Sequence, residues 1–170
     1  MNTSSKFLAT AAAAVALFFS TNVNAQSSPK FGIGLNVGAP TSNAYSFAIG
    51  GDLRYQFDVD KQLSIPITTG YTRFIGKDVG AFTTPDYAYI PLKAGLKYFF
   101  NDTGAGAYGL GEIGAAFSVG NYSGTEFVYS PAIGYAWSNG LDLAAKYEGM
   151  NINTINTGYF GLRLAYGFKL

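Results

Sequence analysis

Eight charged residues share one face of segments that alternate in polarity, and they are the candidates for chemistry in this chain. They are three acids and five bases: Asp52, Arg54, Lys93, Lys97, Glu112, Lys146, Glu148 and Arg163. Counted along extended segments at about 3.3 Å per residue, they fall at similar depths. Acids and bases held together away from water must pair, because an unpaired buried charge is strongly unfavourable. The pattern predicts a network of ion pairs, which either closes the space around it or exchanges partners to pass ions.

The composition excludes most other chemistry. The chain has no histidine and no cysteine, which rules out imidazole bases, thiolate nucleophiles, disulfides and most zinc sites. A formal net charge of +1 gives no reason to expect nucleic acid. Glycine patterns at 104–109 and 109–114 match a dinucleotide fingerprint, but neither opens a helix, so no cofactor is expected. Asp58 and Asp60 are interpreted as turn residues and not as a cation site, and no enzymatic activity is predicted.

The first 25 residues have the pattern of a secretory signal peptide. Lys6 precedes an apolar run at 8–19, and Val23-Asn24-Ala25 supplies small residues where a signal peptidase cuts. Twelve helical residues span about 18 Å, which is too short for a membrane anchor. We therefore predict cleavage after Ala25, with residues 26–170 forming the mature domain.

Beyond the signal peptide, apolar residues recur with a period of two, which is typical of β-strands. The predicted strands are about 11–12 residues long, enough for a tilted membrane strand and twice the usual length in soluble sheets. The segment 107–119 alternates less regularly and suggests a bulge. Alternation runs through 31–38, 45–57, 63–71, 90–100, 107–119, 127–137, 141–148 and 160–170. Eight such strands without helices predict an all-β, eight-stranded antiparallel up-and-down transmembrane β-barrel.

The connections between these strands alternate in length. The short ones, at 58–62, 101–106 and 138–140, are rich in turn-forming residues. The longer set lies at 39–44, 74–86, 120–125 and 149–158. Short turns at one end and longer loops at the other are typical of outer-membrane barrels. Loops 74–86 and 149–158 are expected to face outward and to offer surfaces for partners.

The two faces of the strands differ in a way that indicates a membrane. One face is large and aromatic. The other is mostly Gly, Ala, Ser and Thr with few charges, which suits a crowded lumen better than a solvated exterior. Aromatic residues also gather near both strand ends, as interfacial girdles do. The girdle at the short turns comprises Phe57, Tyr98, Phe100, Tyr135, Trp137 and Phe168, and the opposite one comprises Tyr45, Phe47, Tyr71, Tyr87, Phe127, Tyr147 and Phe160.

Two stretches carry a family resemblance. Residues 89–100, Tyr-Ile-Pro-Leu-Lys-Ala-Gly-Leu-Lys-Tyr-Phe-Phe, look like a central barrel strand, and residues 160–170 place aromatics at alternate positions up to the carboxyl end. The mature chain resembles the outer-membrane protein beta-barrel domain family of Gram-negative bacteria. That resemblance implies outer-membrane localisation and recognition of the last strand by the barrel-assembly machinery. The family usually ends in Phe, whereas this chain ends in Leu170.

These observations predict an integral outer-membrane barrel with a structural, anchoring or surface-interaction role and a lumen closed by ion pairs. Its expected partners are outer-membrane lipid and the assembly machinery. A small low-conductance channel is the alternative. A soluble periplasmic barrel of the lipocalin kind, carrying an apolar ligand, is a less favoured one. The sequence does not determine the oligomeric state.

Overall fold

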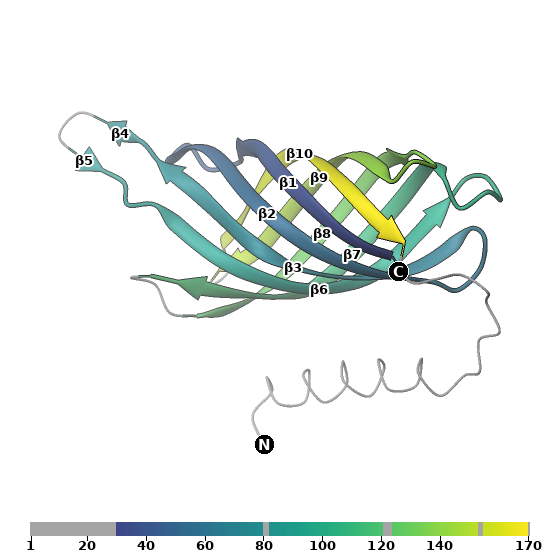
Figure 1. Ribbon diagram of the computed structural model, residues 1–170. Helices are drawn as coiled ribbons and strands as arrows, with labels where there is room; N and C mark the ends of the chain where they lie inside the picture. The colour runs from purple at the N-terminus through teal and green to yellow at the C-terminus, as the bar shows by residue number, and fades with distance from the viewer. Residues whose placement is uncertain (1–29, 80–81, 121–123, 153–154, 170) are drawn as a thin grey trace, which may run out of the picture.

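The eight predicted strands form a closed antiparallel barrel, shown in Figure 1. The computed structural model describes residues 30–79, 82–120, 124–152 and 155–169. The eight-stranded antiparallel fold predicted from the sequence is confirmed. No helix in these described ranges is long and apolar enough to cross a membrane. The barrel strands are β1 (Lys30–Pro40), β2 (Tyr45–Asp58), β3 (Leu63–Gly76), β6 (Tyr87–Phe99), β7 (Gly106–Val119), β8 (Thr125–Ala136), β9 (Leu141–Ile152) and β10 (Ile155–Lys169).

Strands that follow one another in the chain are neighbours in the barrel, and β1 pairs with β10 to close it. The closing register runs from Lys30 opposite Lys169 to Pro40 opposite Tyr159. Closure leaves no unpaired sheet edge, so the backbone groups of the barrel find partners within it. Full backbone pairing is what allows such a sheet to lie in hydrocarbon.

The one insertion between neighbouring strands is a short ribbon of β4 (Asp78–Val79) and β5 (Phe82–Thr83), which lies between β3 and β6. It projects beyond the barrel at the end opposite the final residues of β10 (Figure 1). We call that end the ribbon end, and the end with turns 59–62, 100–105 and 137–140 the short-turn end. The predicted loop 74–86 therefore contains strand structure, and β3 itself continues to Gly76.

Two other sequence predictions about the connections are wrong. The expected loop 149–158 is mostly strand, because Ile152 pairs with Ile155 and only 153–154 lie outside the described residues. Backbone hydrogen bonds hold this Asn-rich hairpin, so hydrophobic alternation did not reveal it. The expected bulge in 107–119 is also absent, since β7 keeps an unbroken register with β6 and β8. The alternation looks irregular there because Tyr108 and Leu110 are buried on the inner face.

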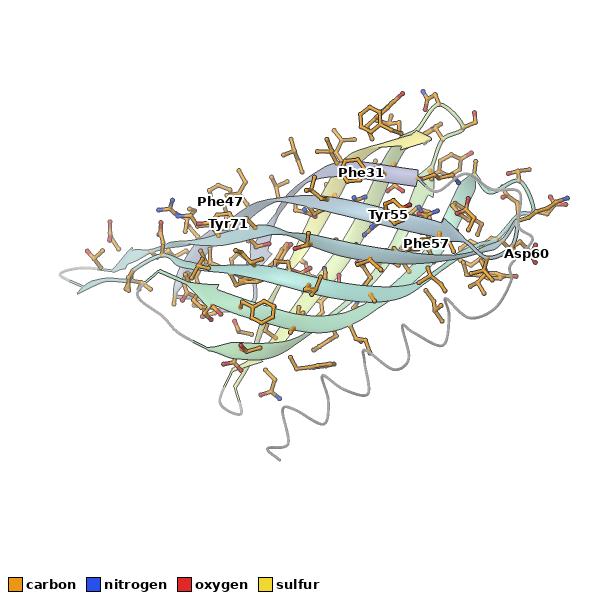
Figure 2. All side chains as sticks on the ribbon, turned by 60° about the horizontal axis from the view of Figure 1, so that its bottom comes forward. Phe31, Phe47, Tyr55, Phe57, Asp60 and Tyr71 are labelled. Carbon is orange, nitrogen blue, oxygen red and sulfur yellow. The ribbon has the colours of Figure 1, made fainter. Side chains whose placement is uncertain are left out.

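Large apolar side chains cover the outer face of the barrel. Leu35, Ile113 and Ile133 are the most exposed aliphatic residues at mid-strand, with 67%, 62% and 68% of their surface accessible. Aromatic residues lie near both ends, as Figure 2 shows for Phe47 and Tyr71 at one end and for Tyr55 and Phe57 at the other. Within the girdle predicted at the short turns, Phe57 is half-buried and the following five are exposed: Tyr98, Phe100, Tyr135, Trp137 and Phe168.

Two residues assigned to the girdle of the ribbon end turn inward instead. Tyr87 is 7% exposed and packs in the lumen beside Phe74 and Tyr89. Tyr45 is half-buried, with its ring centre 5.4 Å from that of Phe74. A register irregularity between Tyr45 and Phe47 in β2 changes the alternation there. Period-two counting could not detect this shift, because the shift breaks the period itself.

The lumen is occupied by side chains in three zones. Between two apolar clusters lie nine ion-paired residues, which we call the charge layer: Asp52, Arg54, Lys93, Lys97, Glu112, Asp142, Lys146, Glu148 and Arg163. The ribbon-end cluster comprises Ala48, Phe74, Tyr87, Tyr89, Ala116, Val128, Met150 and Tyr159, with Tyr45 packed against it. The short-turn cluster comprises Phe99, Tyr108, Leu110 and Ala144, with Ala132 and Ala136 packed against it.

We expect Gly114→Ala to destabilise the barrel by about 1–3 kcal/mol. A Cβ atom at Gly114 would lie 2.0 Å from the backbone oxygen of Leu92, so β6 and β7 would have to separate. Gly111→Ala on the same strand is the matched control, because a Cβ atom there meets nothing within 4 Å. The measurement is urea unfolding of the purified barrel in detergent. Equal midpoints for the two variants would contradict the close approach of the strands at Gly114.

Candidate functional site

The alternation of five strands directs all eight predicted charged residues into the lumen. Asp52 and Arg54 come from β2, Lys93 and Lys97 from β6, and Glu112 from β7. The remaining three are Lys146 and Glu148 from β9 and Arg163 from β10. Every one of these side chains is at most 8% exposed. The barrel thus brings together residues that are up to 111 positions apart in the sequence.

The first of two ion-pair chains runs across β2, β7, β6 and β9. Arg54 Nη2 lies 3.2 Å from Glu112 Oε2, and Lys93 Nζ lies 3.8 Å from the same oxygen. Lys93 also pairs closely with Glu148 Oε2. Lys146 Nζ lies 3.1 Å from that oxygen and ends the chain. We call these five residues the Glu148 chain; it contains three cations and two carboxylates.

The second chain contains a residue that the sequence prediction left out. Arg163 pairs with Asp52 at 2.6 Å and with Asp142 at 3.5 Å, and Lys97 pairs with Asp142 at 2.8 Å. Asp142 shares the inward parity of Lys146 and Glu148, which was the available signal. It is the second residue of β9, next to the turn that precedes the strand. The length of the Arg163 and Lys97 side chains connects it to the charge layer.

Uncharged side chains complete the hydrogen bonding of the four carboxylates. Tyr89 OH donates to Glu148 Oε1 at 2.6 Å, and Tyr108 OH donates to Asp142 Oδ1 at 2.6 Å. Thr68 donates to Glu112 Oε1 at 2.5 Å, and Asn36 Nδ2 donates to Asp52 Oδ2 at 2.7 Å. Each carboxylate therefore has both cationic and neutral donors. Sequence reasoning missed Tyr89 and Tyr108, because it assigned no role to aromatics on the polar face.

The ion pairs and hydrogen bonds of the charge layer fix the positions of its charged side chains. A general base needs a carboxylate that is available to accept a proton, whereas all four carboxylates of the charge layer are engaged. Among the described residues, no three acidic, histidine or cysteine side chains are arranged to bind a metal ion. The geometry supports a rigid, ion-paired interior.

The ribbon end carries a smaller polar contact that fixes the base of the β4–β5 ribbon. The Gly76 amide donates to Asp86 Oδ1 at 2.8 Å, and Arg73 Nε donates to Asp86 Oδ2 at 2.8 Å. These two donors, the Gly76 amide first, hold the pKa of Asp86 below its ordinary value. The Lys77 amide donates to the Ala44 carbonyl at 2.9 Å, which ties the ribbon to the connection before β2.

Known structures resemble this barrel over most of its length. The attachment invasion locus protein Ail of Yersinia pestis is 18% identical, with a TM-score of 0.60, covering 84% of this chain and 100% of that chain. The N-terminal β-barrel domain of Pseudomonas aeruginosa OprF is 15% identical, with a TM-score of 0.60 and the same coverage of both chains. A de novo designed transmembrane β-barrel is 15% identical, with a TM-score of 0.57, covering 86% of this chain and 99% of that chain. At these identities the likeness shows the fold.

No curated protein matches the chain by sequence. The family model for the outer membrane protein beta-barrel domain does match it, over residues 11–168. This family match confirms the predicted localisation to the bacterial outer membrane. The alternative of a soluble periplasmic carrier is therefore wrong; the charged residues lie inside the barrel and the apolar face outside. The chain belongs to the outer membrane protein beta-barrel domain family.

Proposed function

We propose that this protein is a non-conducting, non-enzymatic barrel that serves as a membrane anchor and presents its ribbon end for contacts at the cell surface. The observation that carries the proposal is the occupied lumen. Two ion-pair chains cross it, and an apolar cluster lies toward each end of the barrel. An eight-stranded barrel is narrow enough for side chains to fill its interior.

The ribbon end supports the surface role. The β4–β5 ribbon stands beyond the barrel (Figure 1), and its base is tied to β3 and to the connection before β2 by the contacts of Lys77, Gly76 and Asp86. A surface held on a rigid scaffold loses little conformational entropy when it binds. One structure of the similar protein Ail, 16% identical with a TM-score of 0.58, is a complex with the heparin analogue sucrose octasulfate. By analogy, the ribbon end here is the region proposed to meet a partner.

The route to the membrane is part of the same proposal. Residues 1–25, which lie outside the described residues, act as a cleaved signal peptide. The last strand, with Tyr166 and Phe168 on its outer face, is recognised by the barrel-assembly machinery. The alternating aromatics at the end of β10 support this role.

We expect the purified protein to show no stable conductance in a planar lipid bilayer. The Glu148→Ala variant is expected to be equally silent, because the ribbon-end cluster still covers the lumen when the Glu148 chain is broken. A porin added to the same bilayer confirms that openings are detectable. Discrete openings of the wild type that change in Glu148→Ala would instead favour the channel, with Lys93 exchanging between Glu112 and Glu148.

A further inference from the structure

The charges buried in the charge layer do not balance. Among the described residues it holds five cations and four carboxylates. The second chain is neutral, with Arg163 and Lys97 against Asp52 and Asp142. The excess positive charge therefore belongs to the Glu148 chain. A buried charge without a counter-charge is strongly unfavourable, and every side chain of the Glu148 chain is at most 8% exposed.

One hydrogen-bond donor within the Glu148 chain and one on the neighbouring strand β8 have no partner in the described part of the chain. Arg54 uses Nε for Thr68 and Nη2 for Glu112, and its Nη1 has no hydrogen-bond partner among the described residues. The residue is only 6% exposed. Ser130 is 1% exposed, and its hydroxyl also has no partner in the described part of the chain. Ser130 lies opposite Glu112 in the β7–β8 register, and Arg54 donates to the Glu112 carboxylate.

We propose that the lumen binds a small monovalent anion, chloride under ordinary conditions, beside the Glu148 chain. The anion accepts a hydrogen bond from Arg54 Nη1, and Ser130 Oγ is the second donor assigned to it. One negative charge makes the charge layer neutral and gives the unsatisfied guanidinium nitrogen a charge-assisted partner. This inference goes beyond the proposed function, since anchoring and surface contact do not require it.

Unfolding of the intact barrel in zwitterionic detergent tests the proposal. The midpoint is measured by the heat-dependent gel shift in sodium chloride, sodium bromide and sodium gluconate, at equal ionic strength and pH. Binding to the folded state raises the midpoint in chloride and bromide by about 3–6 °C over gluconate, which is too large to enter. The rise saturates with anion concentration, whereas general screening does not discriminate between these salts in this way.

The matched variants are Arg54→Met and Arg73→Met. Arg54→Met leaves four cations and four carboxylates in the charge layer, so the difference between chloride and gluconate is expected to vanish. Arg73→Met removes an exposed arginine at the ribbon end. This variant is expected to keep the difference in midpoint between chloride and gluconate. If Arg54→Met does not fold, Glu112→Gln serves instead, because it adds excess positive charge and should enlarge the anion effect.

The proposal is overturned by a wild-type midpoint that is the same in all three salts. A midpoint that does not depend on the anion but rises with pH would show that a lumen lysine loses its proton, so that no anion is needed to balance the charge. An undiminished chloride effect in folded Arg54→Met would place the anion elsewhere and would also refute the assignment. None of these outcomes bears on the conductance or on the surface role, so the two proposals fail separately.

Discussion

Replacing Glu148 by alanine is expected to lower the free energy of unfolding by about 3–5 kcal/mol, the usual loss when one partner of a buried ion pair is removed. Glu148 is 1% exposed. Its two oxygens accept hydrogen bonds from Lys93, Lys146 and Tyr89. Without the carboxylate, the ammonium groups of Lys93 and Lys146 lose the counter-charge that they share.

The measurement is urea unfolding of the folded protein in lipid vesicles, followed by tryptophan fluorescence. Asp60→Ala is the matched control, because Asp60 lies exposed in the turn after β2 and its loss should change stability by no more than about 0.5 kcal/mol. The double variant Glu148→Ala with Lys93→Met should recover part of the loss, since it removes one of the stranded ammonium groups. A Glu148→Ala effect no larger than that of Asp60→Ala would contradict a buried ion-pair chain.

An arginine in place of Leu35 is expected to destabilise the barrel by about 2–4 kcal/mol in a bilayer, as measured for arginine on the lipid face of such barrels. Leu35 lies near the middle of β1 with 67% of its surface outside the barrel, so the substitution disturbs no lumen contact. The loss comes from placing a guanidinium group in hydrocarbon. The loss of stability should be smaller for a leucine-to-arginine substitution nearer a strand end, because the guanidinium group can reach the membrane interface there.

The measurement is the unfolding of Leu35→Arg in lipid vesicles, with Asn43→Arg as the control. The comparison separates the effect of contact with lipid from a general effect of the added charge. Asn43 is exposed in the connection between β1 and β2, and an arginine there is expected to be neutral within about 0.5 kcal/mol. If both variants were equally stable, the aromatic and aliphatic face would be in contact with water. That result would reverse the assignment of the two faces.

Much of this architecture follows from local properties of the chain. Side chains alternate across a strand with an exact period of two, so the parity of Asp52, Lys93 and Glu148 already indicates that they share a face. The length of the alternating segments and the short turns between them predict the barrel and its strand count. The aromatic residues near the strand ends of the outer face indicate that this face contacts the membrane.

Which inward residues meet was decided by the tertiary structure. The strands are staggered around the barrel, so depth counted from the turn does not give depth in the lumen. The network predicted from the sequence lacks Asp142, although Asp142 pairs with both Lys97 and Arg163. Parity determined the face of most residues. Tyr87 shares the inward parity of Tyr89 and Lys93 but was assigned to the outer girdle, and the irregularity in β2 turned Tyr45 inward. Contacts between residues distant in sequence depend on stagger and on the reach of long side chains, and a period of two records neither.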